Sequence, residues 1–243
     1  MSNHSLLSDI LMQARITDQT AFIMRRREWR NTSLIVDLFT LDYGCVSALA
    51  KGARGSASSS RYQPFTPLQV NWTGQRELKT LTSVESFNLP VSEKNYLALL
   101  YINDLTLGLL PKAEPHLEIF EAYLQLLHLA AEPLKEENLR RYELELVSQL
   151  GYFPDISHEA DTGALIEADG CYHFEIGKGF VNCSPTSPDA VDGGMIHDWL
   201  SGRYERDQVC RLAKSVLRST IDFNLHGKAL KSRDVSREIL RRK

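Results

Sequence analysis

AFIMRRREWRNTSLIVDLFTLDYGCVSALAK (Ala21–Lys51) contains the first three of five short apolar runs that follow one another along the chain. The other two are PLQVNW (Pro67–Trp72) and LKTLTSV (Leu78–Val84). Each run has the length of a β-strand, and the segments between them are rich in glycine, serine and charge. Five such runs in succession predict a small β-barrel over residues 20–89.

The connections between these runs carry cationic and aromatic side chains, chiefly in RRREWRN (Arg25–Asn31) and KGARGSASSSRYQ (Lys51–Gln63). A five-stranded barrel with basic connections is typical of an OB-fold that binds nucleic acid. Guanidinium and ammonium groups neutralise phosphates, and an exposed indole can stack on a base. The predicted nucleic-acid contacts are Arg25, Arg26, Arg27, Trp29, Arg30, Lys51, Arg54, Arg61 and Tyr62. The other interpretation is a solvated charge run with Trp29 in the core, followed by an inert linker.

The charge of the chain changes along its length, although the net charge is only −3. Residues 1–90 hold ten lysines and arginines against seven acidic residues, and residues 171–243 hold thirteen against nine. Residues 91–170 hold five against fifteen. Basic ends around an acidic middle indicate that different segments bind different partners.

Helical periodicity begins after Pro90, with the dense apolar run NYLALLYINDLTLGLL (Asn95–Leu110). We expect an α+β protein: an N-terminal extension (1–19), an OB-fold barrel (20–89) and a mainly helical domain (90–243). A short amphipathic helix at Leu6–Arg15 is one interpretation of the extension. Residues 152–188 interrupt the helices, and the Asp169-Gly170 pair there predicts a small hairpin.

Several functional classes lack their sequence signals. The four cysteines are widely spaced, with no CxxC and no HxxxH pair, so neither a disulfide framework nor a zinc site is expected. No Walker A, GxGxxG or GxSxG motif is present, so we expect no cofactor and no enzymatic activity. The N-terminus does not resemble a signal peptide and no apolar run is long enough to span a membrane, which favours a reduced cytoplasmic protein.

Two further basic groups allow two interpretations each. Arg140 and Arg141 can pair with Glu136, Glu137 and Glu145 on a helix surface, the interpretation that the residues alone favour. They can instead form a cationic seat for an acidic peptide, with Leu144 beside it. The C-terminal segment is either a solubilising end or an extension of the nucleic-acid footprint, through Lys228, Lys231 and Arg233.

Six motifs occur here in an order that resembles the RecO family of recombination mediators. They are TSLIV (Thr32–Val36), AKGAR (Ala50–Arg54), QPFTPL (Gln63–Leu68), LRRYEL (Leu139–Leu144), LGY (Leu150–Tyr152) and LKSR (Leu230–Arg233). The resemblance covers nearly the whole chain from Thr20 onward. It implies an OB-fold followed by a helical domain. It also implies a non-enzymatic protein that binds single- and double-stranded DNA and anneals complementary strands.

The resemblance also implies partners: RecR, in some settings RecF, and RecA, which such proteins help to load onto DNA coated by single-strand binding protein. The acidic C-terminal tail of that protein would bind the helical domain, which favours Arg140, Arg141 and Leu144 as its contacts, Arg141 first. Lys51 and Arg54 would lie in the DNA-binding barrel, and Lys231 and Arg233 near its basic margin.

Some family members carry paired cysteines that form a zinc module in the helical domain, but only Cys171 and Cys183 remain in that region here, so we expect it to be metal-free. We expect a bacterial cytoplasmic protein, associated with the nucleoid during repair and monomeric on its own. The alternative is an OB-fold adaptor that binds nucleic acid and scaffolds partners without annealing. A metal-dependent nuclease has no evident carboxylate cluster to support it.

Overall fold

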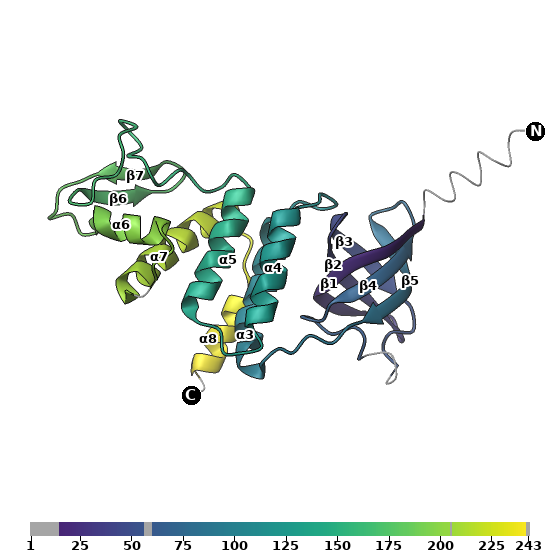
Figure 1. Ribbon diagram of the computed structural model, residues 1–243. Helices are drawn as coiled ribbons and strands as arrows, with labels where there is room; N and C mark the ends of the chain where they lie inside the picture. Colours follow the sequence, from purple (N-terminus) through teal and green to yellow (C-terminus); the bar gives the residue numbers. More distant parts are fainter. Residues whose placement is uncertain (1–14, 56–59, 205, 242–243) are drawn as a thin grey trace, which may run out of the picture. The chain divides into compact units, whose positions relative to one another are not determined.

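The N-terminal half of the structure, a computed structural model, is built around a closed five-stranded barrel (Figure 1). The structure describes residues 15–55, 60–204 and 206–241. The strands are β1 (Arg15–Trp29), β2 (Ser33–Thr40), β3 (Gly44–Ala50), β4 (Leu68–Thr73) and β5 (Leu78–Ser86). They pair in the order β1-β2-β3-β5-β4, β4 closes back onto β1, and β3 runs parallel to β5. This arrangement confirms the predicted OB-like barrel.

The alternation of side chains along β1 and β2 explains why these strands are apolar on both faces. Ala21 and Ile23 point into the barrel core. Phe22 and its cross-strand partner Phe39 lie on the opposite face, where their rings pack at 5.5 and 5.2 Å from that of Phe120. The outer face of the barrel is therefore covered by a helix, so SLIVDLFT reads as a continuous apolar run.

Three helices and a short 3₁₀ turn complete the barrel unit, which comprises residues 1–133 and 230–243. They are η1 (Glu93–Asn95), α3 (Tyr96–Leu109), α4 (Leu117–Leu129) and α8 (Lys231–Arg241). Asp104 of α3 accepts hydrogen bonds from the backbone N and Oγ of Ser232, both at 3.1 Å, and so caps the start of α8. The aromatic cluster around Phe120 fastens these helices to the strands of the barrel.

The second unit comprises residues 134–229. Its elements are α5 (Glu136–Gln149), β6 (Cys171–Glu175), β7 (Gly179–Asn182), β8 (Val191–Asp192), α6 (Gly193–Leu200) and α7 (Asp207–Asn224). The strands form a sheet in the order β7-β6-β8, and the side chain of Asp192 caps α6 by accepting from Gly194 N at 2.8 Å. The α+β class is thus confirmed, with the small irregular hairpin region inserted between helices.

Strand β1 starts earlier than predicted. It begins at Arg15, inside the expected extension of residues 1–19, because Arg15 and Ile16 pair with Thr73 and Trp72 of β4. Apart from Arg15, the helix expected at Leu6–Arg15 lies outside the described residues. Within the described part of the chain, no helix is both long enough and apolar enough to cross a membrane.

Candidate nucleic-acid interface

A bulge in β1 separates the buried part of the strand from its arginine run. The register with β2 shifts between Ile23 and Arg25. Asn103 of α3, buried in the interface with the barrel, donates through Nδ2 to the carbonyl oxygens of Ile23 at 3.4 Å and Met24 at 3.1 Å. Its Oδ1 accepts from the Tyr123 hydroxyl at 2.7 Å. The bulge is therefore held from outside the sheet, and it redirects the strand where its polar run begins.

Beyond the bulge, every residue of β1 from Arg25 to Trp29 is exposed. Arg25 Nε pairs with Asp37 Oδ2 at 2.8 Å, and the same carboxylate accepts from Ser47 Oγ at 2.5 Å. The side chains of Arg27 and Arg30 make no ion pair or hydrogen bond to another described residue. Arg25 is thus partly neutralised, whereas Arg27 and Arg30 keep their full charge for a ligand.

Arg54 and Arg26 connect this strand end to the loop that follows β3. Arg54 donates through Nη1 to the Arg30 carbonyl at 2.9 Å and pairs through Nη2 with Glu28 at 2.9 Å. Arg26 Nη1 donates to the Tyr62 carbonyl at 2.9 Å. We name Arg25, Arg26, Arg27, Arg30 and Arg54 the arginine rim. A hollow of about 350 Å³ is lined by Arg26, Arg27, Glu28, Leu34, Ala53 and Arg54.

The remaining predicted barrel residues differ in how they are placed. Trp29 is 44% exposed, so its indole is accessible beside the rim. Lys51 and Arg61 are also exposed. Tyr62 is half-buried and packs against the barrel core, and burial, opposed by the charge of Arg61, raises the pKa of its phenol. The ring of Tyr62 therefore supports the barrel rather than offering a free stacking face.

The C-terminal candidates belong to two different units of the chain. Lys231 is exposed at the start of α8, which packs on α3. The Arg233 guanidinium lies over the ring of Tyr101 at 5.6 Å, a cation–π contact within the barrel unit. Lys228 is an exposed residue of the second unit. Lys231 and Arg233 therefore belong to the same unit as the arginine rim, and Lys228 to the other unit.

In the second unit, the two adjacent arginines of α5 have opposite environments. Arg140 is 6% exposed and its Nη2 pairs with Glu143 Oε1 at 3.0 Å. Arg141 is exposed, donates to the Gly202 carbonyl at 2.7 Å and lies 4.8 Å from the centre of the Tyr204 ring. Leu144 is half-buried on the same helix. Arg141 is therefore the arginine of this pair that an external anion can reach.

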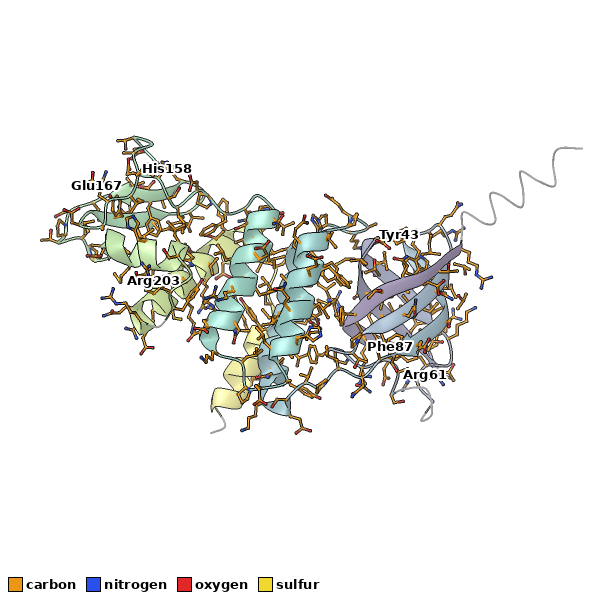
Figure 2. All side chains as sticks on the ribbon, in the orientation of Figure 1. Tyr43, Arg61, Phe87, His158, Glu167 and Arg203 are labelled. Atoms are coloured by element: carbon orange, nitrogen blue, oxygen red, sulfur yellow. The ribbon has the colours of Figure 1, made fainter. Side chains whose placement is uncertain are left out.

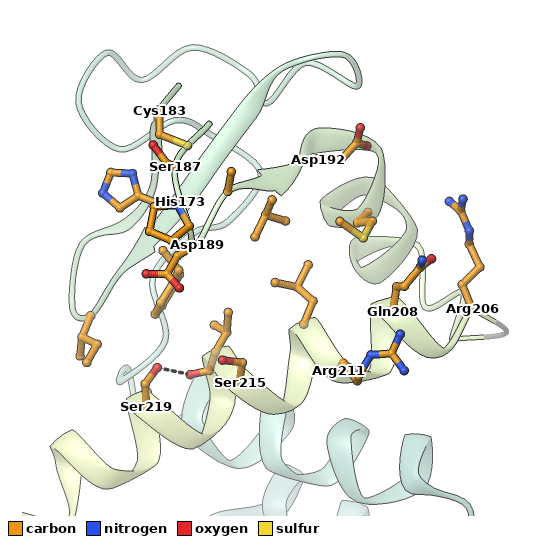
Figure 3. Close-up of a pocket in the computed structure, with 18 residues that line it drawn as sticks. His173, Cys183, Ser187, Asp189, Asp192, Arg206, Gln208, Arg211, Ser215 and Ser219 are labelled. Carbon is orange, nitrogen blue, oxygen red and sulfur yellow. Dashed lines mark hydrogen bonds between the residues drawn. The ribbon is translucent and has the colours of Figure 1, made fainter. Parts of the chain in front are cut away.

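A larger hollow, of about 1000 Å³, lies in the second unit between the small sheet and α7. Figure 3 shows Arg206 and Arg211 on one side of it and His173 and Asp189 on the other. Arg206 is already paired with Asp198 at 3.0 Å. The mixed charge makes this hollow a weaker candidate for phosphates than the arginine rim.

Cys171 begins β6 and Cys183 directly follows β7, and the backbone N of Cys183 donates to the Cys171 carbonyl at 2.9 Å. Burial and the adjacent Cys183 thiol raise the pKa of the Cys171 thiol. Among the described residues, no group of three or more His, Cys, Asp or Glu side chains comes together as a metal site. The described part of the chain thus offers no evident place for zinc.

Sequence reasoning missed three residues that bear on the interface. Asn103 lies within the apolar run Asn95–Leu110, and its amide was not recognised as functional. A single amide inside so dense an apolar run is itself a signal of a buried hydrogen-bonding role. Phe87 and Tyr96, both 46% exposed, follow the last strand of the barrel. The sequence around these two residues does not differ from that around buried aromatic residues, so no sequence pattern could have identified them as accessible.

Comparison with known proteins agrees with this architecture. The family model for "Recombination protein O N terminal" matches residues 12–90, and that for "Recombination protein O C terminal" matches residues 93–194. The DNA repair protein RecO of Marinobacter nauticus is 35% identical over 234 residues, spanning 92% of this chain and 95% of that protein. The DNA repair protein RecO of Erwinia tasmaniensis is 38% identical over 231 residues, spanning 93% and 94%. The chain belongs to the RecO family of DNA repair and recombination proteins.

Proposed function

We propose that this chain is a recombination mediator that binds single- and double-stranded DNA through the arginine rim. The observation that carries the proposal is the pair of uncommitted guanidinium groups, Arg27 and Arg30, beside the exposed indole of Trp29. They lie at one end of an OB-type barrel, in a family of recombination proteins. Lys51 and Arg61, exposed on the adjoining loop segments, extend the same positive surface.

The rim suits strand annealing better than sequence recognition. Ion pairs with Asp37 and Glu28 hold Arg25 and Arg54 in place, while Arg27 and Arg30 neutralise phosphates. Partial neutralisation lowers the repulsion between two strands and raises their local concentration, which accelerates pairing without nucleotide hydrolysis. The protein would act as a chaperone for strands and not as an enzyme.

The second unit would supply the partner contact. We propose that Arg141 binds the acidic C-terminal tail of single-strand binding protein, with Leu144 alongside, and that Arg140 supports α5 from within. Holding the tail would place the rim next to coated DNA and add avidity. Together with RecR, and in some settings RecF, the protein would help RecA to load onto DNA during repair in the bacterial cytoplasm. In the absence of these partners it would be a monomer.

Annealing of two complementary labelled oligonucleotides, without nucleotide, tests this function. The strands are used bare and then coated with single-strand binding protein. Acceleration on both substrates is the expected result. Binding without acceleration would instead establish the alternative, an OB-fold adaptor that scaffolds its partners, and cleavage on addition of Mg²⁺ would overturn the non-enzymatic assignment.

A further inference from the structure

Two exposed aromatic side chains lie close together in sequence at the exit from the barrel. Phe87 follows β5, and its backbone N donates to the Pro67 carbonyl at 2.9 Å. Tyr96 begins α3. Each is 46% exposed, although rings of this size usually account for much of a protein's buried surface. Exposed apolar side chains point to a binding site when they form a continuous patch or line a groove.

Tyr96 lines a groove of about 520 Å³ in the barrel unit, which we name the exit groove. Its lining comprises Gln63, Pro64, Phe65, Thr66, Asn88, Leu89, Pro90, Val91, Tyr96 and Leu100. Phe87 immediately precedes this lining. None of these described lining residues carries a carboxylate, so nothing in the lining repels a polyanion. The apolar surface and the amide group of Asn88 match the faces and edges of nucleobases.

The Tyr96 ring is supported from beneath. Phe65 is 5% exposed, and its ring centre lies 5.7 Å from that of Tyr96 at an interplanar angle of 48°. Phe65 has a backbone φ of +64°, a conformation that costs energy in a residue other than glycine. Because Phe65 supports the Tyr96 ring from one side, the Tyr96 ring loses little freedom when a base stacks on its outer face.

The exit groove continues the arginine rim. Arg26 of the rim donates to the Tyr62 carbonyl at 2.9 Å, and the next residue, Gln63, lines the groove. Arg61, on the other side of Tyr62, is exposed. Figure 2 shows Arg61 and Phe87 at the same end of the barrel, with Tyr43 at the other end. The chain therefore leads directly from a residue that the arginine rim contacts into the lining of the groove.

We propose that the exit groove binds the bases of single-stranded DNA, with Phe87 and Tyr96 as stacking platforms. The phosphates of the same strand lie on the arginine rim. Continuity with the rim and the absence of acidic lining favour a nucleic-acid strand over a peptide. This inference rests on the proposed function, because it requires the rim to hold DNA. It adds that unpaired bases are gripped, which would favour single strands over duplex.

The test compares an intact single-stranded oligonucleotide with one of equal length that carries a run of abasic positions, by fluorescence anisotropy. Abasic positions keep the phosphates and remove the bases. We expect the wild-type protein to bind the abasic strand at least about 25-fold more weakly than the intact strand, because stacking on both rings is lost. Phe87→Leu and Tyr96→Leu should each weaken binding of the intact strand about fivefold or more. Both should leave binding of the abasic strand and the salt dependence unchanged, because no cation is lost.

Tyr43→Leu is the matched control, since it removes a ring that is 37% exposed at the other end of the barrel. It should leave both affinities unchanged, and Phe87→Trp should bind the intact strand as wild type does. If Phe87→Leu and Tyr96→Leu leave the intact-strand affinity unchanged, or weaken both strands equally, the base site is wrong while the rim remains. Failure of the wild-type protein to bind either strand would remove the proposed function as well.

Discussion

The two arginine runs of this chain, RRREWR on β1 and LRR on α5, contain the same letters but provide different chemistry. On β1, consecutive arginines project from a strand that extends past the barrel core, and all of them reach solvent. On α5, successive side chains lie about 100° apart around the helix axis, so Arg140 turns inward while Arg141 faces outward. The secondary structure beneath a charge run therefore decides how many of its charges a ligand can reach.

A second difference is how each run is held. Arg25 and Arg54 of the rim are fixed by carboxylates, whereas the side chains of Arg27 and Arg30 have no partner in the described part of the chain. Arg141 is fixed by a carbonyl and by the Tyr204 ring, which leaves its charge uncompensated. Gly202 permits this contact, because a Cβ there would lie 3.1 Å from Arg141 Nη1. Both runs thus contain arginines that are held by other protein groups and arginines whose charge is open to a ligand, but the numbers of each kind differ between the runs.

The largest predicted difference between the two runs is in protein stability, and it is expected on substitution of Arg140. Arg140→Ala should lower the free energy of unfolding by about 3–5 kcal/mol, because it leaves the carboxylate of Glu143, 1% exposed, without its ion-pair partner. Urea denaturation followed by circular dichroism measures this. Arg141→Ala serves as the control and should change stability by less than about 1 kcal/mol. Equal losses in the two variants would contradict the inward and outward assignment.

A smaller effect separates Arg25 from its neighbours. Arg25→Ala should lower the free energy of unfolding by about 1–3 kcal/mol, since the buried Asp37 keeps Ser47 as a donor but loses its charged partner. Arg27→Ala should stay within about 0.5 kcal/mol of wild type, because its side chain has no partner among the described residues. Thermal unfolding of both variants measures the difference. If the two melt alike, Arg25 is not anchored and belongs with the free cations.

The smallest effect concerns Arg141 and the tail of single-strand binding protein. Arg141→Ala should weaken binding of a fluorescent tail peptide about tenfold, the loss typical of one charge-assisted contact, while bare-DNA affinity stays unchanged. Arg141→Lys should recover only part of the binding, because an ammonium keeps the charge but not the planar stacking on Tyr204. Loss of DNA binding in step with peptide binding would mean that the second unit also holds DNA.

The barrel could be predicted from the sequence because its five strands alternate or are continuously apolar, and turn residues separate them. The start of β1 could not, since Arg15 and Ile16 are held by pairing with β4 and not by any local pattern. The packing of the helices against the barrel could not be predicted either, for a similar reason. Phe22, Phe39 and Phe120 join strands to helices through contacts that sequence order does not reveal.

For the candidate site, the sequence identified the basic segments but could not assign each arginine. Exposure of Trp29 and half-burial of Tyr62 depend on where the barrel ends, which is set by the bulge that Asn103 holds. Whether Arg140 or Arg141 faces solvent depends on which side of α5 packs on α7. Both are tertiary facts, so the sequence could supply the candidates but not separate them.

The most direct measurement is the salt dependence of single-stranded DNA binding by Arg27→Ala/Arg30→Ala. Each phosphate contact contributes about 0.7 to the slope of log K against log salt for a single strand, so losing both should reduce the slope by about 1.4. The control variant Arg211→Ala/Arg218→Ala also removes two positive charges, in this case from α7, and should keep the wild-type slope. That pattern is the result predicted for a DNA site on the arginine rim. An unchanged slope in the rim variant, or an equal fall in both variants, would contradict it.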